Sequence, residues 1–162
     1  MNSYEFSLRF DVADCGLDHD EMDDRLFDSG CDDALVRHGR KAELLIEFDR
    51  QGATALETIE TAKRQVIEAL PEARLLEAKP DFVSPTDIAQ VYGLSRQRVQ
   101  ILMQTQLARI HAFTCVGNTQ VFRLVTVIDE LTKQGKQDVD DTVREAAFAA
   151  MQMNRENELA QI

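Results

Sequence analysis

The chain has 162 residues, 44% of them hydrophobic, and a formal net charge of −11. That length allows one compact domain or two small ones, and the apolar content is enough for a buried core. No apolar run approaches the ~18 residues of a membrane helix, and the opening MNSYEFSLRF has no basic stretch followed by an apolar one, so we expect no signal peptide and a cytoplasmic location.

The charge is distributed unevenly along the chain. Residues 1–83 hold 10 Lys or Arg against 20 Asp or Glu, and residues 138–162 hold 2 against 6. Residues 84–137 hold 6 against 3, so this segment is the only basic one. Because phosphate contact depends on the local patch as well as on the whole molecule, residues 84–137 are the candidate for binding nucleic acid.

The first elements are a strand and a short helix. Polar and apolar side chains alternate over residues 3–12, which predicts a strand with one buried face. A helix follows, with Asp18 as its N-cap and Glu21 closing a capping box. Its apolar stripe comprises Met22, Leu26 and Phe27, and Ser29-Gly30 ends it.

Two strands and a second helix come next. Residues 31–36 and 42–49 read as strands joined by a turn around Gly39. The second of these strands is expected to bury Ala42, Leu44, Ile46 and Phe48. Thr54, with Glu57, caps a longer helix that Pro71 ends, and residues 73–78 form a fourth strand. The buried face of that helix carries Leu56, Ile59, Ala62, Val66 and Leu70.

The element order of residues 1–80 is therefore β-α-β-β-α-β, which predicts a ferredoxin-like α+β domain. A fold of this kind does not define one function. Two interpretations remain open for this domain, a packing and dimerisation module or a small-molecule sensor.

Acidic residues crowd the segment 11–33. Their spacing does not match the alternating ligands of a calcium loop, so we expect no metal site here. A solvated acidic face or a surface that docks a basic partner are the two interpretations. The cluster comprises Asp11, Asp14, Asp18, Asp20, Glu21, Asp23, Asp24, Asp28, Asp32 and Asp33.

The segment from residue 84 has the pattern of a helix-turn-helix. Ser84 caps a first helix that has Pro85 at its first position and Asp87 closing the box. Gly93 permits a tight turn, and Ser95 caps a second helix. A pair of helices that docks a protein rather than DNA is the alternative.

The second helix can be analysed by angle. At 100° per residue, Ser95, Arg96, Leu102 and Met103 fall on the inward side with Val99. The outward side carries Gln97, Ile101 and Gln104, flanked by Arg98 and Gln100, and no acid. Gln can pair with adenine, Arg with guanine or phosphate, and Ile with a thymine methyl, so this face is suited to a major groove.

The stretch DIAQVYGLSRQRVQILM resembles the helix-turn-helix of the MerR and excisionase (AlpA-like) winged families. Two short β-like runs, RIHAFTCV and QVFRLV, follow around residues 117–120, and then the amphipathic helix TVIDELTKQGK with Val127, Ile128 and Leu131 inward. The resemblance covers residues 84–136. It implies a winged helix-turn-helix domain, here placed at residues 81–136, that binds double-stranded DNA.

The resemblance also implies the contact residues. Ser95, Arg96, Gln97, Arg98 and Gln100 match the start of the recognition helix, and Asn118, Gln120 and Arg123 match the wing, whose tip is polar but not basic. With the outward residues, the expected DNA-binding set is Thr86, Ser95, Arg96, Gln97, Arg98, Gln100, Ile101, Gln104, Asn118, Gln120 and Arg123.

Residues 137–162 read as one C-terminal helix that Asp140 or Asp141 starts. Its loose stripe of small and apolar residues suits close packing, either on a partner helix in a homodimer, which we favour, or on the body of the protein. The stripe comprises Val143, Ala147, Ala150 or Met151, Asn154 and Leu159.

The sequence shows little that points to catalysis. Cys15, Cys31 and Cys115 are too far apart for a zinc knuckle, and we expect free thiols in a reducing compartment. His19, His38 and His111 lie in three elements, and no phosphate-binding Gly-rich loop or HExxH motif occurs. We expect no enzyme activity and no cofactor.

The sequence favours a homodimeric DNA-binding regulator, and an antitoxin-like or inhibitory protein-interaction module is the alternative.

Overall fold

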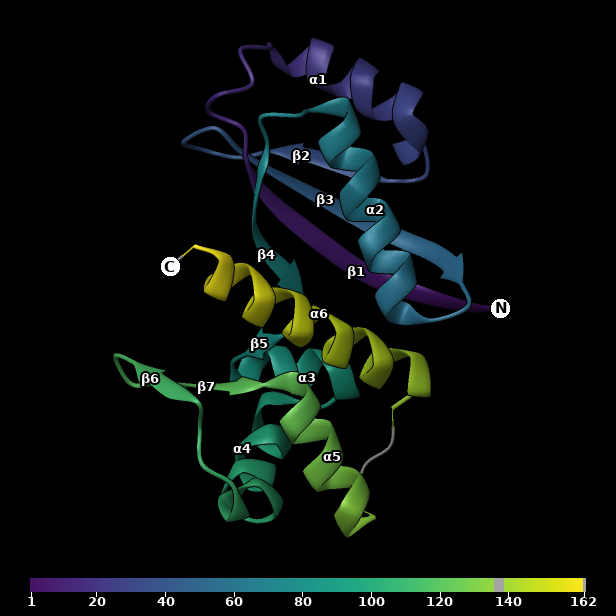
Figure 1. The fold of residues 1–162 in the computed structure, drawn as a ribbon. Coiled ribbons are helices and arrows are strands. Elements are labelled where there is room, and N and C mark those ends of the chain that lie inside the picture. Colours follow the sequence, from purple (N-terminus) through teal and green to yellow (C-terminus); the bar gives the residue numbers. More distant parts are fainter. Residues whose placement is uncertain (136–138, 162) are drawn as a thin grey trace.

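A computed structural model describes residues 1–135 and 139–161 of the chain. It is a mixed α+β structure with two lobes and a long helix between them (Figure 1). The boundary expected between residues 136 and 137 lies outside the described residues. We call residues 1–79 the first lobe and residues 82–135 the second lobe, because each has a hydrophobic core of its own.

The first lobe begins with strand β1 (Asn2–Asp11), and the alternation read from the sequence is confirmed. Tyr4, Phe6, Leu8 and Phe10 are buried, and the side chains between them are exposed or half-buried. β1 pairs antiparallel with β3 (Glu43–Gly52), and this register sets Phe6 opposite Phe48 with their rings stacked at 4.9 Å. Cross-strand aromatic pairs of this kind help to fix a sheet's register.

Helix α1 (His19–Leu26) has the expected capping box of Asp18 and Glu21. Its apolar stripe differs from the expectation, since Phe27 is 64% exposed. The helix continues as a wider π-type turn, η1 (Phe27–Cys31), and Cys31 is buried instead. A π turn shifts the angular position of each residue, so a stripe extrapolated at 100° per residue fails beyond Leu26.

The hairpin of β2 (Leu35–His38) and β3 also departs from the expectation. β2 begins later than residue 31, because residues 31–34 form a turn in which Ala34 N–H donates to the Cys31 carbonyl. The turn between the strands is centred on Lys41 and Ala42, which have φ angles of 58° and 56°. Ala42 is therefore an exposed turn residue, and the buried alternation of β3 starts at Leu44.

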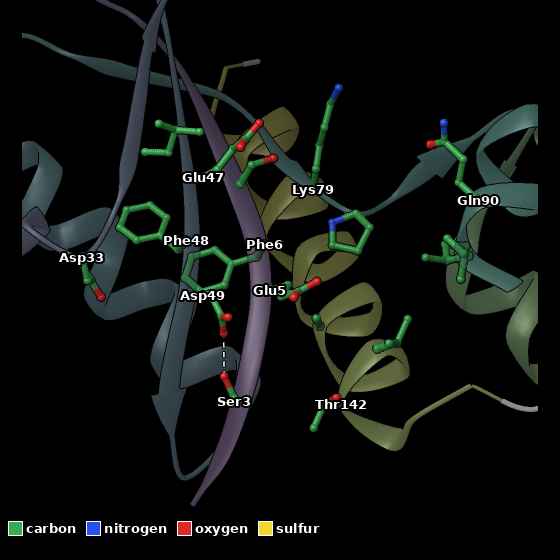
Figure 2. Close-up of a pocket in the computed structure, with 17 residues that line it drawn as sticks. Ser3, Glu5, Phe6, Asp33, Glu47, Phe48, Asp49, Lys79, Gln90 and Thr142 are labelled. Carbon is green, nitrogen blue, oxygen red and sulfur yellow. Dashed lines mark hydrogen bonds between the residues drawn. The ribbon is translucent and has the colours of Figure 1, made fainter. Parts of the chain in front are cut away.

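The four-stranded sheet has the order β2-β3-β1-β4 with every neighbouring pair antiparallel. Helix α2 (Ala55–Ala69), capped by Thr54, precedes β4 (Arg74–Lys79). The buried strand face forms one core with residues of α1, α2 and the C-terminal helix. On the opposite face, which carries Ser3, Glu5 and Asp49 (Figure 2), the side chains of β1 and β3 are exposed or half-buried. We call it the open face.

The second lobe contains helices and a smaller sheet. Its elements are β5 (Phe82–Val83), α3 (Pro85–Tyr92), α4 (Arg96–Gln104), the 3-10 turn η2 (Gln106–Arg109), β6 (Thr114–Val116), β7 (Thr119–Arg123) and α5 (Leu124–Gln134). The three strands have the order β5-β7-β6. Val127, Ile128 and Leu131 of α5 are buried as expected, and Gly135 ends the helix with a φ of 65°.

Helix α6 (Asp141–Ala160), capped by Asp140, lies on the body of the protein between the lobes (Figure 1). It contacts β1, β4 and α2 of the first lobe and α5 of the second. Ala149, Ala150 and Met153 belong to the first core and Ala147 to the second, so the stripe is used within the chain and not kept for a partner helix. Leu159 is 70% exposed and does not belong to this stripe.

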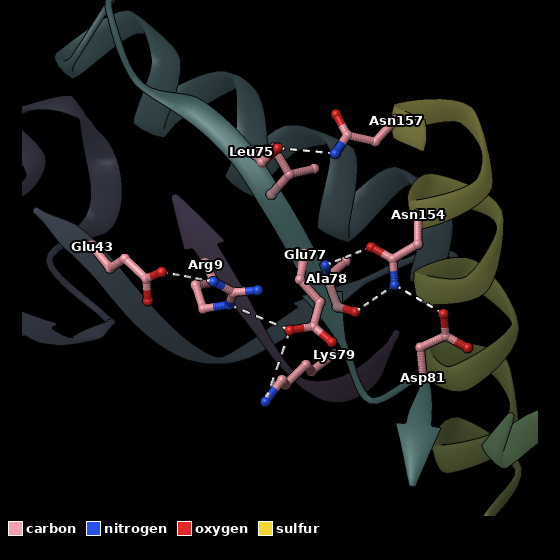
Figure 3. A network of polar contacts seen from close by, with 9 residues as sticks. All are labelled: Arg9, Glu43, Leu75, Glu77, Ala78, Lys79, Asp81, Asn154 and Asn157. Carbon is pink, nitrogen blue, oxygen red and sulfur yellow. Dashed lines mark hydrogen bonds and ion pairs between the residues drawn. The ribbon is translucent and has the colours of Figure 1, made fainter. Parts of the chain in front are cut away.

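Asn154 of α6 covers the free edge of β4 (Figure 3). Its Oδ1 accepts from Ala78 N–H at 2.7 Å, and its Nδ2 donates to the Ala78 carbonyl at 2.8 Å and to Asp81 Oδ2 at 2.9 Å. Asn157 Nδ2 donates to the Leu75 carbonyl at 2.9 Å. The two amides thus bond backbone groups that a further strand would otherwise pair with, and they keep the edge from pairing with another chain.

We expect Asn154→Ala to lower the free energy of unfolding by about 1–3 kcal/mol, because it leaves both buried polar groups of Ala78 without a partner. Urea denaturation followed by circular dichroism measures the loss. Asn157→Ala is the matched control, since it removes one half-buried hydrogen bond and should cost less. Equal effects of the two substitutions would contradict this role of Asn154.

Candidate nucleic-acid interface

Helices α3 and α4 are joined by a tight turn and pack against each other. Ser84 and Asp87 form the expected capping box at the start of α3, and Ser95 Oγ accepts from Arg98 N–H at the start of α4. Between them Gly93 has a φ of 65°, a conformation that glycine adopts without strain. The Leu94 N–H donates to the Ala89 carbonyl at 2.8 Å, which closes the turn.

The outward face of α4 is the one that the sequence predicted. Gln97, Arg98, Gln100, Ile101 and Gln104 are exposed, and Ile101 is 61% exposed. An exposed apolar side chain here is suited to contact an apolar group such as a thymine methyl.

The inward face of α4 is narrower than the angles indicated. Val99 and Leu102 are buried and Met103 is half-buried, but Ser95 and Arg96 are exposed. The expectation that these two face inward is wrong, because α4 begins at Arg96 and the core contacts it only from Val99 onward. Arg96 therefore joins the exposed set.

The cations of α4 are available to a ligand. Among the described residues, neither Arg96 nor Arg98 lies within 4 Å of a carboxylate oxygen. The helix itself contains no acid. Asp87, the acid on α3, accepts hydrogen bonds from Ser84. Two unpaired guanidiniums beside glutamine amides can donate to phosphate oxygens or base edges.

Strands β6 and β7 form a hairpin that projects from the second lobe (Figure 1). Gly117, with a φ of 60°, and Asn118 make its two-residue tip. Asn118 and Gln120 are exposed, as is Val116 at 67%. Thr86 is exposed in the first turn of α3. The polar side chains of Thr86, Asn118 and Gln120 can form hydrogen bonds with a DNA phosphate backbone, but the hairpin tip carries no cation.

Arg123 does not belong to this surface, and its expected role in DNA contact is corrected. Its Nη1 lies 2.6 Å from Asp81 Oδ2 in an ion pair whose side chains are 11% and 0% exposed. The guanidinium also stacks on Phe82 and Phe113, at 4.5 and 5.1 Å from the ring centres. With its charge paired and its planar face covered, Arg123 holds β7 in place rather than facing a ligand.

Arg109 is a cation that the sequence analysis did not single out. It ends η2, which packs against α4, and it is exposed with no carboxylate partner among the described residues. The one signal that could have found it was the local excess of basic residues in segment 84–137. We add it to the candidate contact set.

The histidines and cysteines form no further site of this kind. The rings of His19 and His38 stack at 3.9 Å, and His38 Nε2 lies 2.7 Å from Asp23 Oδ1. Residues so far apart in sequence gave no signal of this contact. Within residues 1–135 and 139–161, no group of three or more metal-ligating side chains gathers. The three cysteines are free, and burial raises the pKa of Cys15 and Cys31.

No protein-family model matches the chain, and neither curated proteins nor solved structures give a match. In the part of the chain that the structure describes, no helix has the length and apolar character needed to cross a membrane. The case for function therefore rests on the geometry of the second lobe and on its charges.

Proposed function

We propose that this protein is a cytoplasmic, non-enzymatic regulator that binds specific DNA sequences as a homodimer. The second lobe would act as a winged helix-turn-helix of the MerR or excisionase (AlpA-like) type, with α4 in the major groove and the β6–β7 hairpin beside a phosphate backbone. The observation that carries the proposal is the exposed face of α4, with two unpaired arginines, three glutamines and no acid.

The arrangement of elements supports the same proposal. A capped helix, a glycine turn and a second capped helix are followed by an antiparallel hairpin and an amphipathic helix, with β5 adding a third strand. For the first lobe, the order β2-β3-β1-β4 with antiparallel neighbours supports a ferredoxin-like domain. Such a domain would serve dimerisation or ligand sensing.

Charge limits how this protein can bind DNA. The first lobe and α6 are acidic and repel DNA at long range, while the basic contacts come from a few residues. We therefore expect weak non-specific binding and a need for two recognition helices on a paired site.

The proposal is tested by incubating the purified protein with fragmented DNA from its own source at about 150 mM salt and sequencing the retained fragments. Enrichment of a short inverted repeat is expected, and the half-site spacing would report the geometry of the dimer. No binding even at low salt would overturn the proposal and leave the protein-interaction module.

We expect Arg109→Ala to weaken binding about equally on all sequences and to lower the slope of log K against log salt by about one, since a phosphate contact carries no sequence information. Anisotropy titrations at several salt concentrations measure this slope. A loss confined to one base position would instead assign Arg109 to base reading.

A further inference from the structure

A groove of about 930 Å³ separates the open face of the four-stranded sheet from the second lobe (Figure 2). β1 and β3 form one wall and α3 forms the other, with the first turns of α6 beside them. Pro80 also lines the groove. This size lies within the range of clefts that bind ligands. The groove is separate from the exposed face of α4.

The lining of the groove is acidic. Four carboxylates and one ammonium group, that of Lys79, line it. Two of the carboxylates already pair with arginines outside the groove. Glu5 and Asp49 have no cationic nitrogen within 4 Å among the described residues, although Asp49 accepts a hydrogen bond from Ser3 at 2.6 Å. Two charges are thus left for a ligand to neutralise.

Apolar side chains lie among these charges. Leu35 of β2 is 52% exposed, and Val91 of α3 and Val143 of α6 are half-buried. A partner that places apolar groups on these three side chains would remove their surface from water and gain the hydrophobic term as well as the charge pairing.

We propose that this groove docks a basic, extended segment of a partner protein, with lysine or arginine side chains at Glu5 and Asp49 and apolar side chains against Leu35, Val91 and Val143. Charge decides the occupant. DNA would be repelled here, and a second copy docked with its own open face would present the same carboxylates. The proposal does not depend on DNA binding by the second lobe.

The test uses a fluorescein-labelled peptide in which lysine and valine alternate, titrated with the full chain at about 150 mM salt. The variant Glu5→Gln/Asp49→Asn should weaken binding about three- to tenfold, because partly exposed ion pairs are individually modest. The matched control is Asp24→Asn/Asp28→Asn, which removes the same charge from exposed positions on α1 and η1 and should leave affinity unchanged.

Amide NMR shifts give a second measurement on the unmodified protein. Adding peptide to saturation should change the amide chemical shifts of residues in β1, β3 and the first turns of α6. Equal losses in both variant pairs, shifts centred on α1, or equal binding of a glutamate–valine peptide would overturn the proposal. Dimerisation of the free protein through this face, detected by sedimentation and lost in Glu5→Gln/Asp49→Asn, would assign the groove to a second copy instead.

Discussion

Replacing Asp81 with alanine is expected to lower the free energy of unfolding by about 3–5 kcal/mol, the range found when one partner of a buried ion pair is removed. Asp81 is 1% exposed, and its Oδ2 accepts from both Arg123 and Asn154. Its loss leaves the Arg123 guanidinium buried beside Phe82 and Phe113 without a counter-charge. Urea denaturation measures the loss.

A double-mutant cycle separates the pair from its surroundings. Asp81→Ala combined with Arg123→Met should cost less than the sum of the two single substitutions, because the double variant leaves no unpaired charge. Asp129→Ala is the control, since its ion pair with Arg144 is about half exposed and should contribute no more than about 1 kcal/mol. A loss in Asp81→Ala no larger than that of Asp129→Ala would contradict the structural role of the buried pair.

The second large effect concerns DNA affinity. We expect Arg98→Ala to cost about 1–3 kcal/mol on the selected site if the side chain reads a base. The double substitution Arg96→Ala/Arg98→Ala should abolish the preference for that site at about 150 mM salt. Both guanidiniums are exposed and unpaired among the described residues, so their removal leaves the fold unaffected and the change in Kd reports contact with DNA.

The control for charge is Arg155→Ala on α6. Arg155 is exposed and forms no ion pair among the described residues, so the Arg155→Ala substitution removes one positive charge without changing α4. Its Kd should stay close to that of the unmodified chain. Unchanged binding in the Arg96/Arg98 double variant, or an equal loss in Arg155→Ala, would exclude α4 as the DNA-reading element.

Local features of the fold could be predicted where each depended on one element and its ends. The alternation of β1, the caps at Asp18, Ser84 and Ser95, and the exposed face of α4 are all in the structure. Each follows from the direction of side chains within one element, or from a capping hydrogen bond between residues three positions apart. The predicted element boundaries were wrong where the backbone departs from regular helix or strand geometry, as in the π turn at Phe27 and the turn at Ala42.

The candidate site could be predicted in part for the same reason. The exposed residues of α4 follow from the helical period of 100° per residue. The same period placed Arg96 on the inward side, because it does not show that the core contacts α4 only from Val99 onward. Arg123 was assigned to the wing surface because its strand position gave no sign of a buried partner 42 residues earlier in the chain.

The sequence by itself thus determined the order of the main helices and strands, the uneven charge and the outward face of α4, but not β5 or the turns η1 and η2. Only the tertiary structure decided which distant parts of the chain come together: Asp81 with Arg123, Asn154 with the edge of β4, and the walls of the groove that holds Glu5 and Asp49. Periodicity fixes how a side chain points relative to its own helix or strand, whereas its partners depend on how separate elements dock, and that is settled by packing of the whole core.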